Sequence, residues 1–355
     1  MEIVKCDPNF SIPTEIKKDG LVFLNALKPP FRIHGLICES GSWRRMPRTT
    51  AEKVSEEVVT LNEMSAGGRI RFQTDSPFVA VSVKLCITAK MSHFPLSGSI
   101  GCDLYAETDG IDRYMGAFIP SFGVEKTYES VIDLYGSGLR QMTLNLPLYS
   151  GISEIYIGLK GGAQLLPPRD YRYSKPVVYY GSSVTQGGCA ARPGCSYQSL
   201  LSRALDCDYV NLGFSGNAKG EKAMADYIAG LSMSAFVMDY DYNAPNSEHL
   251  KETHYPMYRR IREAHPDLPI LILSRPKYSY WDWEKAFIDI VAETYEKALS
   301  EGDKKIAYLS GRDLMPSPFS EAALVDHWHP NSAGFLLMAQ AIEPVLKRLL
   351  EITKQ

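Results

Sequence analysis

Hydrophobic and polar positions follow two different patterns in the two halves of the chain. In the first half, short segments alternate between polar and apolar residues, as in 69–74 (Arg-Ile-Arg-Phe-Gln-Thr) and 141–146 (Gln-Met-Thr-Leu-Asn-Leu). This period of two is typical of a half-buried β-strand, because successive side chains point to opposite faces of a sheet. Segments 78–85 and 155–159 follow turn residues and have the same character. Short, closely spaced strands predict an antiparallel β-sandwich or jelly roll.

The second half alternates between continuously apolar runs and longer amphipathic stretches. We expect buried strands at 176–180, 209–212, 235–239, 269–273 and 306–309. We expect helices at 196–205, 219–230, 247–264, 283–300 and 333–351. Strands that alternate with helices predict a five-stranded parallel sheet covered on both faces, a three-layer α/β/α arrangement. The Gly- and Pro-rich stretch 161–168 separates the two patterns, so two domains are expected, at 1–165 and 166–355.

Polar residues and a glycine follow four of the predicted parallel strands. Ser183 follows the first strand and Gly216 the second, while Asn243 follows the third. Asp326 and His329 follow the fifth strand, in the loop before the last helix. The carboxyl ends of parallel strands lie at one edge of a sheet, where ligands of such folds bind. We therefore expect all five residues at the same rim.

The spacing of Asp326 and His329 indicates a particular chemistry. Residues three positions apart in a turn project to the same side, so Asp326 can accept a hydrogen bond from one ring nitrogen of His329. The other ring nitrogen can then face the hydroxyl of Ser183. A serine hydroxyl needs such a base to become a nucleophile, and histidine titrates near neutral pH. The pattern predicts a catalytic triad of Ser183, His329 and Asp326.

These segments resemble the conserved sequence blocks of the SGNH (GDSL-type) hydrolase family. Four blocks are matched, by 181–187 (Gly-Ser-Ser-Val-Thr-Gln-Gly), 211–216 (Asn-Leu-Gly-Phe-Ser-Gly), 241–243 (Asp-Tyr-Asn) and 326–330 (Asp-His-Trp-His-Pro). The resemblance covers roughly 175–352 and implies a flavodoxin-like sheet. It also implies an oxyanion hole formed by the backbone N–H groups of Ser183 and Gly216 and the side-chain amide of Asn243.

Two of the blocks depart from the family pattern. Ser182 stands where the family usually has an aspartate before the nucleophile, and Asp241 replaces the usual glycine of the third block. Asn243 is followed by Ala-Pro rather than by aspartate, which leaves Asn246 as a second candidate for the side-chain donor.

The first half also resembles a known domain. Segments 43–47, 68–72 and especially 101–105 (Gly-Cys-Asp-Leu-Tyr) resemble the Gly-x-Asp-Leu-Tyr domain that precedes some bacterial esterases of this group. Asp103 and Tyr105 alternate with their neighbours across the pleat, so they face either the second domain or solvent.

Composition excludes some classes of function. The net charge is −3 and the basic residues are spread along the chain, which is not typical of nucleic-acid or anionic-membrane binding. No apolar run approaches the ~20 residues of a membrane span. Residues 1–5 lack the apolar segment of a signal peptide. We expect a cytoplasmic protein, or a periplasmic or secreted one if a leader has been removed; an oligomer is possible.

The seven cysteines include no Cys-x-x-Cys pair, so we expect free thiols. Cys189 and Cys195 follow the proposed nucleophile closely and could instead form a bridge or bind a metal. His327 and His329 with Asp326 are a second metal-binding alternative, although they lack a clear fourth ligand.

We therefore expect a serine esterase that hydrolyses short-chain esters through an acyl-serine intermediate. Its substrate would be a small-molecule or saccharide ester, with acetyl on a carbohydrate scaffold as the leading candidate, and it would need neither metal nor organic cofactor. Two alternatives are an acyltransferase with the same acyl-serine and a carbohydrate-binding protein with a vestigial site.

Four other side chains carry expectations of their own. Arg275, which ends the fourth strand, could reach a polar substrate, and Trp281 is expected to pack or to line the rim. His254 and His265 are expected on the exposed face of their helix.

Overall fold

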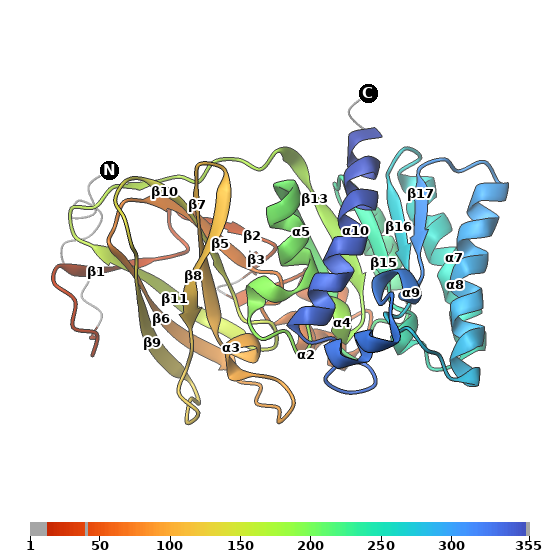
Figure 1. Ribbon diagram of the computed structural model, residues 1–355, viewed down its shortest axis with the longest axis horizontal. Helices are drawn as coiled ribbons and strands as arrows, with labels where there is room; N and C mark the ends of the chain where they lie inside the picture. Colours follow the sequence, from red (N-terminus) through yellow and green to blue (C-terminus); the bar gives the residue numbers. More distant parts are fainter. Residues whose placement is uncertain (1–12, 40–41, 353–355) are drawn as a thin grey trace. The chain divides into compact units, whose positions relative to one another are not determined.

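The computed structural model describes residues 13–39 and 42–352, which form two compact units (Figure 1). Unit 1 comprises Met1–Arg45, Glu63–Asp170 and Ala191–Gly194, and unit 2 comprises Met46–Asn62, Tyr171–Ala190 and Cys195–Gln355. The expected division between residues 165 and 166 stays a prediction. Each unit is described by itself below.

Unit 1 consists mainly of antiparallel strands. Their bounds are β1 (Leu21–Asn25), β2 (Arg32–His34), β3 (Ile37–Glu39), β4 (Ser42–Arg44), β5 (Arg69–Thr74), β6 (Phe78–Ile87), β7 (Cys102–Thr108), β8 (Ile111–Phe118), β9 (Thr127–Asp133), β10 (Arg140–Asn145), β11 (Gly151–Lys160) and β12 (Leu165–Leu166), with one short helix, α3 (Leu96–Ser99). One sheet has the order β1-β11-β6-β9, and the other has the order β12-β5-β10-β7-β8, with β2 paired to β5.

The two sheets of unit 1 share one apolar core. Ile70 and Phe72 of β5 lie in the same buried cluster as Val81 and Val83 of β6. These positions alternate along their strands, so one face of each sheet is covered by the other. The predicted β-sandwich is confirmed. Several strands were not anticipated, among them β8, whose first half is exposed and which shows no apolar alternation.

Asp103 of the Gly-x-Asp-Leu-Tyr segment is fully buried in unit 1 and does not face solvent. Its Oδ1 accepts a hydrogen bond from Asn145 Nδ2 at 2.8 Å. Its Oδ2 accepts from Gly194 N at 2.9 Å and from Arg192 Nη1 at 2.8 Å. A buried carboxylate requires such partners, because losing water is otherwise costly. This aspartate therefore fixes segment 191–194 to β7.

Unit 2 is an α/β unit with a fully parallel sheet. Its strands are β13 (Tyr173–Gly181), β14 (Cys207–Gly213), β15 (Ala235–Asp239), β16 (Ile270–Leu273) and β17 (Ile306–Leu309). Its helical segments are α1 (Arg48–Ala51), α2 (Glu56–Asn62), α4 (Ser183–Gln186), α5 (Tyr197–Leu205), α6 (Lys222–Ala229), η3 (Asp241–Asn243), α7 (Ser247–Ala264), α8 (Asp282–Ser300), α9 (Gly311–Leu314), η4 (Pro318–Ala323) and α10 (Ser332–Ile352). The strand order β14-β13-β15-β16-β17 is that of flavodoxin-like folds.

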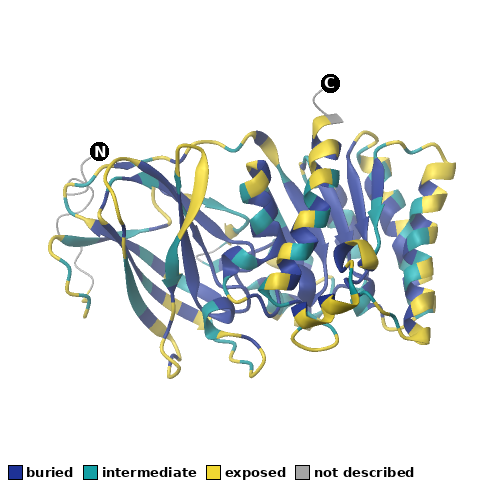
Figure 2. Ribbon diagram, viewed as in Figure 1, coloured by how far each residue is buried: buried dark blue, intermediate teal, exposed yellow. Residues whose placement is uncertain are grey.

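Helices cover both faces of this sheet (Figure 1). α6, α7 and α8 pack on one face, where Val178, Phe236 and Ile270 belong to the same buried cluster as Met257 and Val291. α5 and α10 pack together on the other face. Figure 2 shows the strands as mostly buried and the outer faces of the helices as exposed. The expected three-layer arrangement is confirmed. Within residues 13–39 and 42–352, none of the helices has both the length and the apolar character needed to cross a lipid bilayer.

The short helices α1 and α2 were not predicted. They come from the first half of the sequence, yet Met46, Ala51 and Val58 belong to the buried core of unit 2. They are too short to show a clear helical period, so only their tertiary packing identifies them.

The expectation that His254 lies on the surface is wrong. His254 is fully buried, and its Nδ1 lies 2.8 Å from Thr294 Oγ1 of α8. It shares the buried stripe of α7 with Leu250, Met257 and Ile261, at the spacing expected for one helix face. His265 is half-buried and its Nε2 lies 2.8 Å from Ala229 O.

Burial lowers the pKa of His254 to about 3, so the folded protein holds this ring neutral. The unfolded chain binds a proton at His254 below pH ~6.5, and folding stability from this group is therefore lost as pH falls from 6.5 toward 3. We expect the free energy of unfolding to fall more steeply in this window for the wild type than for His254→Gln, by up to about 1.4 kcal/mol per pH unit. Urea unfolding at several pH values measures both slopes, and equal slopes would contradict this assignment.

Candidate active site

The turn that carries Ser183 follows the end of β13 directly. Ser182 caps the one-turn helix α4, and its Oγ accepts a hydrogen bond from Val184 N at 3.2 Å. Ser183 is the first residue of α4 and is 9% exposed. Gly187 ends the helix with a φ of 101°, a left-handed conformation that glycine adopts without strain. The serine thus stands at a tight strand-to-helix turn.

Two glycines let this turn pack closely against the neighbouring strands. A Cβ atom at Gly181 would lie 2.1 Å from both Asp239 O and Thr185 Oγ1. A Cβ atom at Gly213 would lie 2.2 Å from Gln186 N. Any larger residue at either position would push α4, and Ser183 with it, away from the sheet.

The loop before α10 folds back on Asp326. Asp326 Oδ1 accepts hydrogen bonds from the backbone N–H groups of Trp328, at 2.7 Å, and His329, at 2.8 Å. His329 Nδ1 lies 2.9 Å from Asp326 Oδ2, and its Nε2 lies 2.9 Å from Ser183 Oγ. The structure therefore joins three side chains that are up to 146 positions apart in the sequence. Their catalytic roles stay a prediction.

These contacts also decide the charge of Asp326. Its partial burial alone would raise the pKa of the carboxyl group. Hydrogen bonds from the His329 ring and from the backbone N–H groups of Trp328 and His329 outweigh burial, so the pKa of Asp326 lies below its ordinary value. Asp326 is therefore ionised at neutral pH and can hold a protonated or Nδ1–H imidazole in place.

The other two candidate residues lie at the same edge of the sheet. Gly181 at the end of β13 pairs with Gly213 of β14 on one side and with Asp239 of β15 on the other. Gly216 lies three residues beyond the end of β14 and Asn243 four residues beyond the end of β15, so both belong to the rim that carries Ser183.

Asn243 and the Gly216 loop contact each other. Asn243 Oδ1 accepts a hydrogen bond from Ala218 N at 3.3 Å, so its amide nitrogen is directed away from that loop. Gly216 is exposed, with a φ of 72° and open space beside its Cα. Asn246 has a different role, because its side chain caps α7 by accepting from His249 N at 2.8 Å. The alternative use of Asn246 as a side-chain donor is therefore not supported.

A buried acid lies beneath the serine turn and was missed in the sequence. Asp239 Oδ2 accepts hydrogen bonds from Thr185 Oγ1 at 2.8 Å and from Tyr197 OH at 3.1 Å. Its backbone oxygen accepts from Ser182 N at 3.2 Å. Burial raises the pKa of Asp239 to about 8, so the acid is mainly neutral at pH 7. Asp239 thus ties α4 and α5 to the end of β15.

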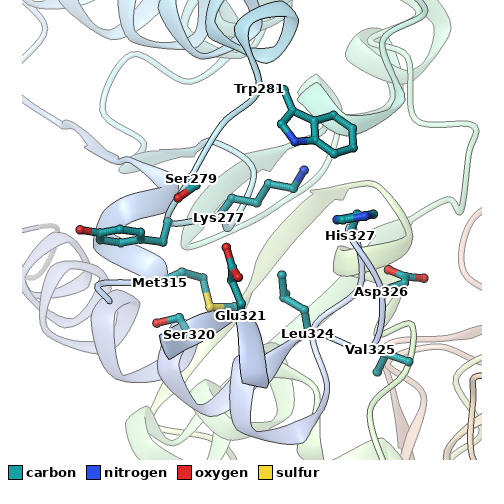
Figure 3. A pocket seen from close by; sticks show the side chains of 11 residues that line it. Lys277, Ser279, Trp281, Met315, Ser320, Glu321, Leu324, Val325, Asp326 and His327 are labelled. Carbon is teal, nitrogen blue, oxygen red and sulfur yellow. The ribbon is translucent and has the colours of Figure 1, made fainter. Parts of the chain in front are cut away.

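A pocket of about 420 Å³ opens beside the loop that carries Asp326 and His327 (Figure 3). Lys277 runs along it toward Trp281, and Glu321 lies on the η4 side. Trp281 is 49% exposed, and its ring lies 5.1 Å from that of His327, between ring centroids. The expectation that Trp281 packs at the rim agrees with these contacts.

Arg275 does not reach the solvent. It is 1% exposed, and its Nε lies 2.9 Å from Asp241 Oδ2. Its Nη1 lies 3.2 Å from Glu284 Oε1. The expectation that Arg275 could reach a polar substrate is therefore wrong, because Asp241 and Glu284 hold its side chain inside the protein.

Cys189 and Cys195 are both free thiols, so a disulfide between them is wrong. Burial, and secondarily the charge of Asp326, raises the pKa of Cys189 to about 12. A thiol that stays protonated at neutral pH is a poor nucleophile. The other metal-binding alternative combined His327 and His329 with Asp326. Both ring nitrogens of His329 already contact other side chains, Nδ1 with Asp326 and Nε2 with Ser183.

Comparison with known proteins shows which families the sequence of this chain matches. The sequence pattern of the GDSL-like lipase/acylhydrolase family matches residues 174–347, and that of the GxDLY domain, the N-terminus of SGNH-hydro-type esterases, matches residues 21–165. None of the curated proteins matches the chain.

Several solved structures share the fold over nearly the whole chain. A protein described as a GDSL-like lipase from Bacteroides ovatus is 26% identical, with a TM-score of 0.83, and the match covers 93% of this chain and 98% of that one. A salicylyl-acyltransferase from a tetracycline biosynthetic pathway is 20% identical, with a TM-score of 0.75 and coverage of 94% and 98%. A family two carbohydrate esterase from Clostridium thermocellum, in complex with cellohexaose, is 15% identical, with a TM-score of 0.60 and coverage of 81% and 94%.

The last two identities are low, so those likenesses show the fold alone. The family matches extend over both units and include the segments around Ser183 and His329. The chain therefore belongs to the GDSL-like lipase/acylhydrolase family, with a GxDLY domain at its N-terminal side, and is a carboxylic ester hydrolase.

Proposed function

We propose that this enzyme is a serine esterase that removes short acyl groups, acetyl above all, from a carbohydrate scaffold through an acyl-serine intermediate. The observation that carries the proposal is the continuous line of hydrogen bonds from Asp326 through His329 to Ser183. The distances from His329 Nδ1 to Asp326 Oδ2 and from His329 Nε2 to Ser183 Oγ are both 2.9 Å. Hydrogen bonds of this length allow Asp326 to orient the base and the base to take the proton of the nucleophile.

The first half-reaction follows from this line. Asp326 keeps the proton of the imidazole on Nδ1, which leaves the Nε2 lone pair directed at the hydroxyl of Ser183. As Ser183 Oγ attacks the ester carbonyl carbon, His329 Nε2 takes its proton. The resulting imidazolium then donates that proton to the departing alcohol oxygen, and the acyl group remains on Ser183.

The second half-reaction repeats these steps with water. Water gives its proton to His329 Nε2 as it attacks the acyl carbonyl carbon. The protonated ring then returns the proton to Ser183 Oγ as the carboxylic acid leaves. All proton transfers use one ring nitrogen, so the same geometry serves both half-reactions.

Three donors would stabilise the negative oxygen of each tetrahedral intermediate. These are the backbone N–H groups of Ser183 and Gly216 and the amide nitrogen of Asn243. Support comes from their common position at the carboxyl ends of β13, β14 and β15, and from the Ala218 contact that orients the Asn243 amide. One such donor typically contributes about 10²–10³ in rate.

The substrate class rests on similar proteins and on the rim. Solved structures with this fold include family two carbohydrate esterases and an acetyl xylan esterase from Butyrivibrio proteoclasticus. The half-exposed Trp281 and Trp283 and the carboxylate of Glu321 offer the mixture of flat apolar faces and charged groups that suits sugars.

A second candidate is acyl transfer to an alcohol in place of water. It is favoured by the likeness in fold to the salicylyl-acyltransferase. The two functions share the acyl-serine and differ only in the acceptor, so product analysis with added alcohols separates them. A vestigial, purely sugar-binding site is disfavoured, because all three hydrogen-bonded side chains are present and correctly joined.

Replacing the triad residues tests the mechanism. We expect Ser183→Ala and His329→Ala each to lower kcat by about 10⁴-fold or more, because either change removes the nucleophile or its base. Asp326→Asn should be less severe, since the base remains. Hydrolysis of p-nitrophenyl acetate measures the rates, and unchanged thermal midpoints establish that the variants fold. Substantial turnover by Ser183→Ala would overturn the assignment of the nucleophile.

Replacing Asn243 tests the oxyanion hole. We expect Asn243→Ala to lower kcat by about 10²–10³-fold with a smaller change in KM, because the amide acts mainly on the transition state. Asn246→Ala is the matched control; it removes a helix cap and should reduce stability by about 1 kcal/mol without this loss of kcat. A large loss in the control together with an active Asn243→Ala would transfer the role to Asn246.

Chain length of the acyl group tests the substrate class. We expect kcat/KM for p-nitrophenyl acetate to exceed that for the octanoate, and acetylated xylo- or cello-oligosaccharides to be deacetylated. Acetate release by wild type, absent in Ser183→Ala, is the readout. A preference for octanoate with no release from acetylated sugars would contradict the proposed substrate.

A further inference from the structure

Four charged side chains form a buried cluster beneath the turn that carries Asn243. They are Asp241, Arg275, Lys277 and Glu284, called the ion-pair cluster below. Asp241 and Glu284 are 0% exposed, Arg275 is 1% exposed and Lys277 is 6% exposed. Two positive and two negative groups balance, so the cluster as a whole carries no net charge.

Arg275 holds both the side chain and the backbone of Asp241. Its Nε donates to Asp241 Oδ2 at 2.9 Å and its Nη2 donates to Asp241 O at 3.0 Å. Its own backbone N–H lies 3.4 Å from Asp241 Oδ2. The planar guanidinium fixes direction as well as distance, which a lysine ammonium cannot do.

Asp241 is the first residue of η3, a single turn that consists of Asp241, Tyr242 and Asn243. The guanidinium carbon of Arg275 also lies 4.9 Å from the centroid of the Tyr242 ring. One side chain therefore contacts the first two residues of a single turn, and the third residue of that turn is Asn243. Asp241, which Arg275 holds, is only two peptide units away from Asn243.

The other end of the ion-pair cluster is also tied down. Glu284 Oε1 accepts from Arg275 Nη1 at 3.2 Å and from Lys277 Nζ at 2.8 Å. Glu284 Oε2 accepts from Trp281 N at 3.0 Å, at the start of α8. Arg275 is thus supported by a helix and cannot move freely with the turn.

Stability alone does not account for this arrangement. Removing four charges from water is costly, and buried ion pairs are often no more stabilising than apolar residues of the same volume. What a buried guanidinium supplies in addition is a fixed geometry. Asp241, moreover, stands where the resembled family motif has a glycine, so this clamp depends on a residue that departs from the motif.

We propose that Arg275 is a positioning residue, which holds the Asp241–Asn243 turn so that the Asn243 amide meets the negative oxygen of the tetrahedral intermediate. The inference rests on the oxyanion role proposed above for Asn243. Arg275 touches neither substrate nor reacting atoms and acts through Asn243.

A double-mutant cycle on p-nitrophenyl acetate hydrolysis tests this inference. Arg275→Lys keeps the charge beside Asp241 and Glu284 but cannot reproduce the contacts of the planar guanidinium with Asp241. We expect Arg275→Lys to lower kcat by about 10- to 100-fold, as a misplaced donor does, with KM changed less than threefold. In the Asn243→Ala background, the same substitution should lower kcat by less than about twofold, because the group it positions is gone.

Arg262→Lys is the matched control. Arg262 donates to Asp303 Oδ2 at 2.9 Å and to the backbone oxygens of His265, at 3.1 Å, and Leu268, at 2.6 Å, near the amino end of β16. Its substitution should lower the thermal midpoint and leave kcat unchanged. If weakening any part-buried arginine lowered kcat, Arg262→Lys would lower kcat as well. If Arg275→Lys does not fold, Asp241→Asn replaces it in the cycle, since it weakens the same clamp at the other partner.

The outcomes separate the inference from the proposed function. Losses of kcat that multiply in the double variant would overturn the inference, because Arg275 would then act independently of Asn243. An active Asn243→Ala would overturn the inference and the oxyanion assignment together. The triad is tested apart from both, by Ser183→Ala in the same assay.

Discussion

The parallel pairing of β13 with β14 and β15 is the constraint on which the site depends. Gly181 pairs with Gly213 on one side and with Asp239 on the other, so three strands end level with one another. Within four residues of these ends the chain supplies a serine, a glycine in a left-handed conformation and an asparagine. Because parallel strands all point the same way, their ends gather these groups without any long-range adjustment. The loop before α10 then brings His329 onto Ser183.

Much of the C-terminal fold could be predicted from the sequence because its strands are buried on both faces. Segments such as β15 and β16 are continuously apolar and are separated by amphipathic stretches, a pattern with few other interpretations. The contact of Asp326 with His329 could be predicted from their spacing. Their contact with Ser183 needed the topology, which the sheet order supplies.

Other features could not be predicted, for identifiable reasons. α1 and α2 are short and lie within a β-rich stretch, so only packing reveals them. Asp239 looks like the last residue of a strand, and nothing local shows that hydroxyl groups of Thr185 and Tyr197 surround it. Arg275 was placed correctly at a strand end, but its partner Asp241 lies 34 residues away. His254 differs from these features: the expectation that it is exposed was wrong, although its position on the apolar stripe of α7 indicates burial.

Buried polar groups support both the serine turn and the Asn243 turn. The neutral acid Asp239 supports the turn that carries Ser183. The ion-pair cluster around Arg275 supports the turn that carries Asn243. Such groups contribute less to stability than apolar residues of equal size could, but they fix direction through hydrogen bonds. A site that must hold a base and an oxyanion donor in place during two half-reactions benefits from this rigidity.

The measurement that tests the central claim most directly is covalent labelling with a fluorophosphonate, followed by peptide mapping. The phosphonate traps an activated serine, whatever the natural substrate is. We expect one label per chain, on Ser183, absent in Ser183→Ala and formed far more slowly in His329→Ala. A folded wild-type enzyme that hydrolyses esters while remaining unlabelled, or that carries its label on another residue, would contradict the account.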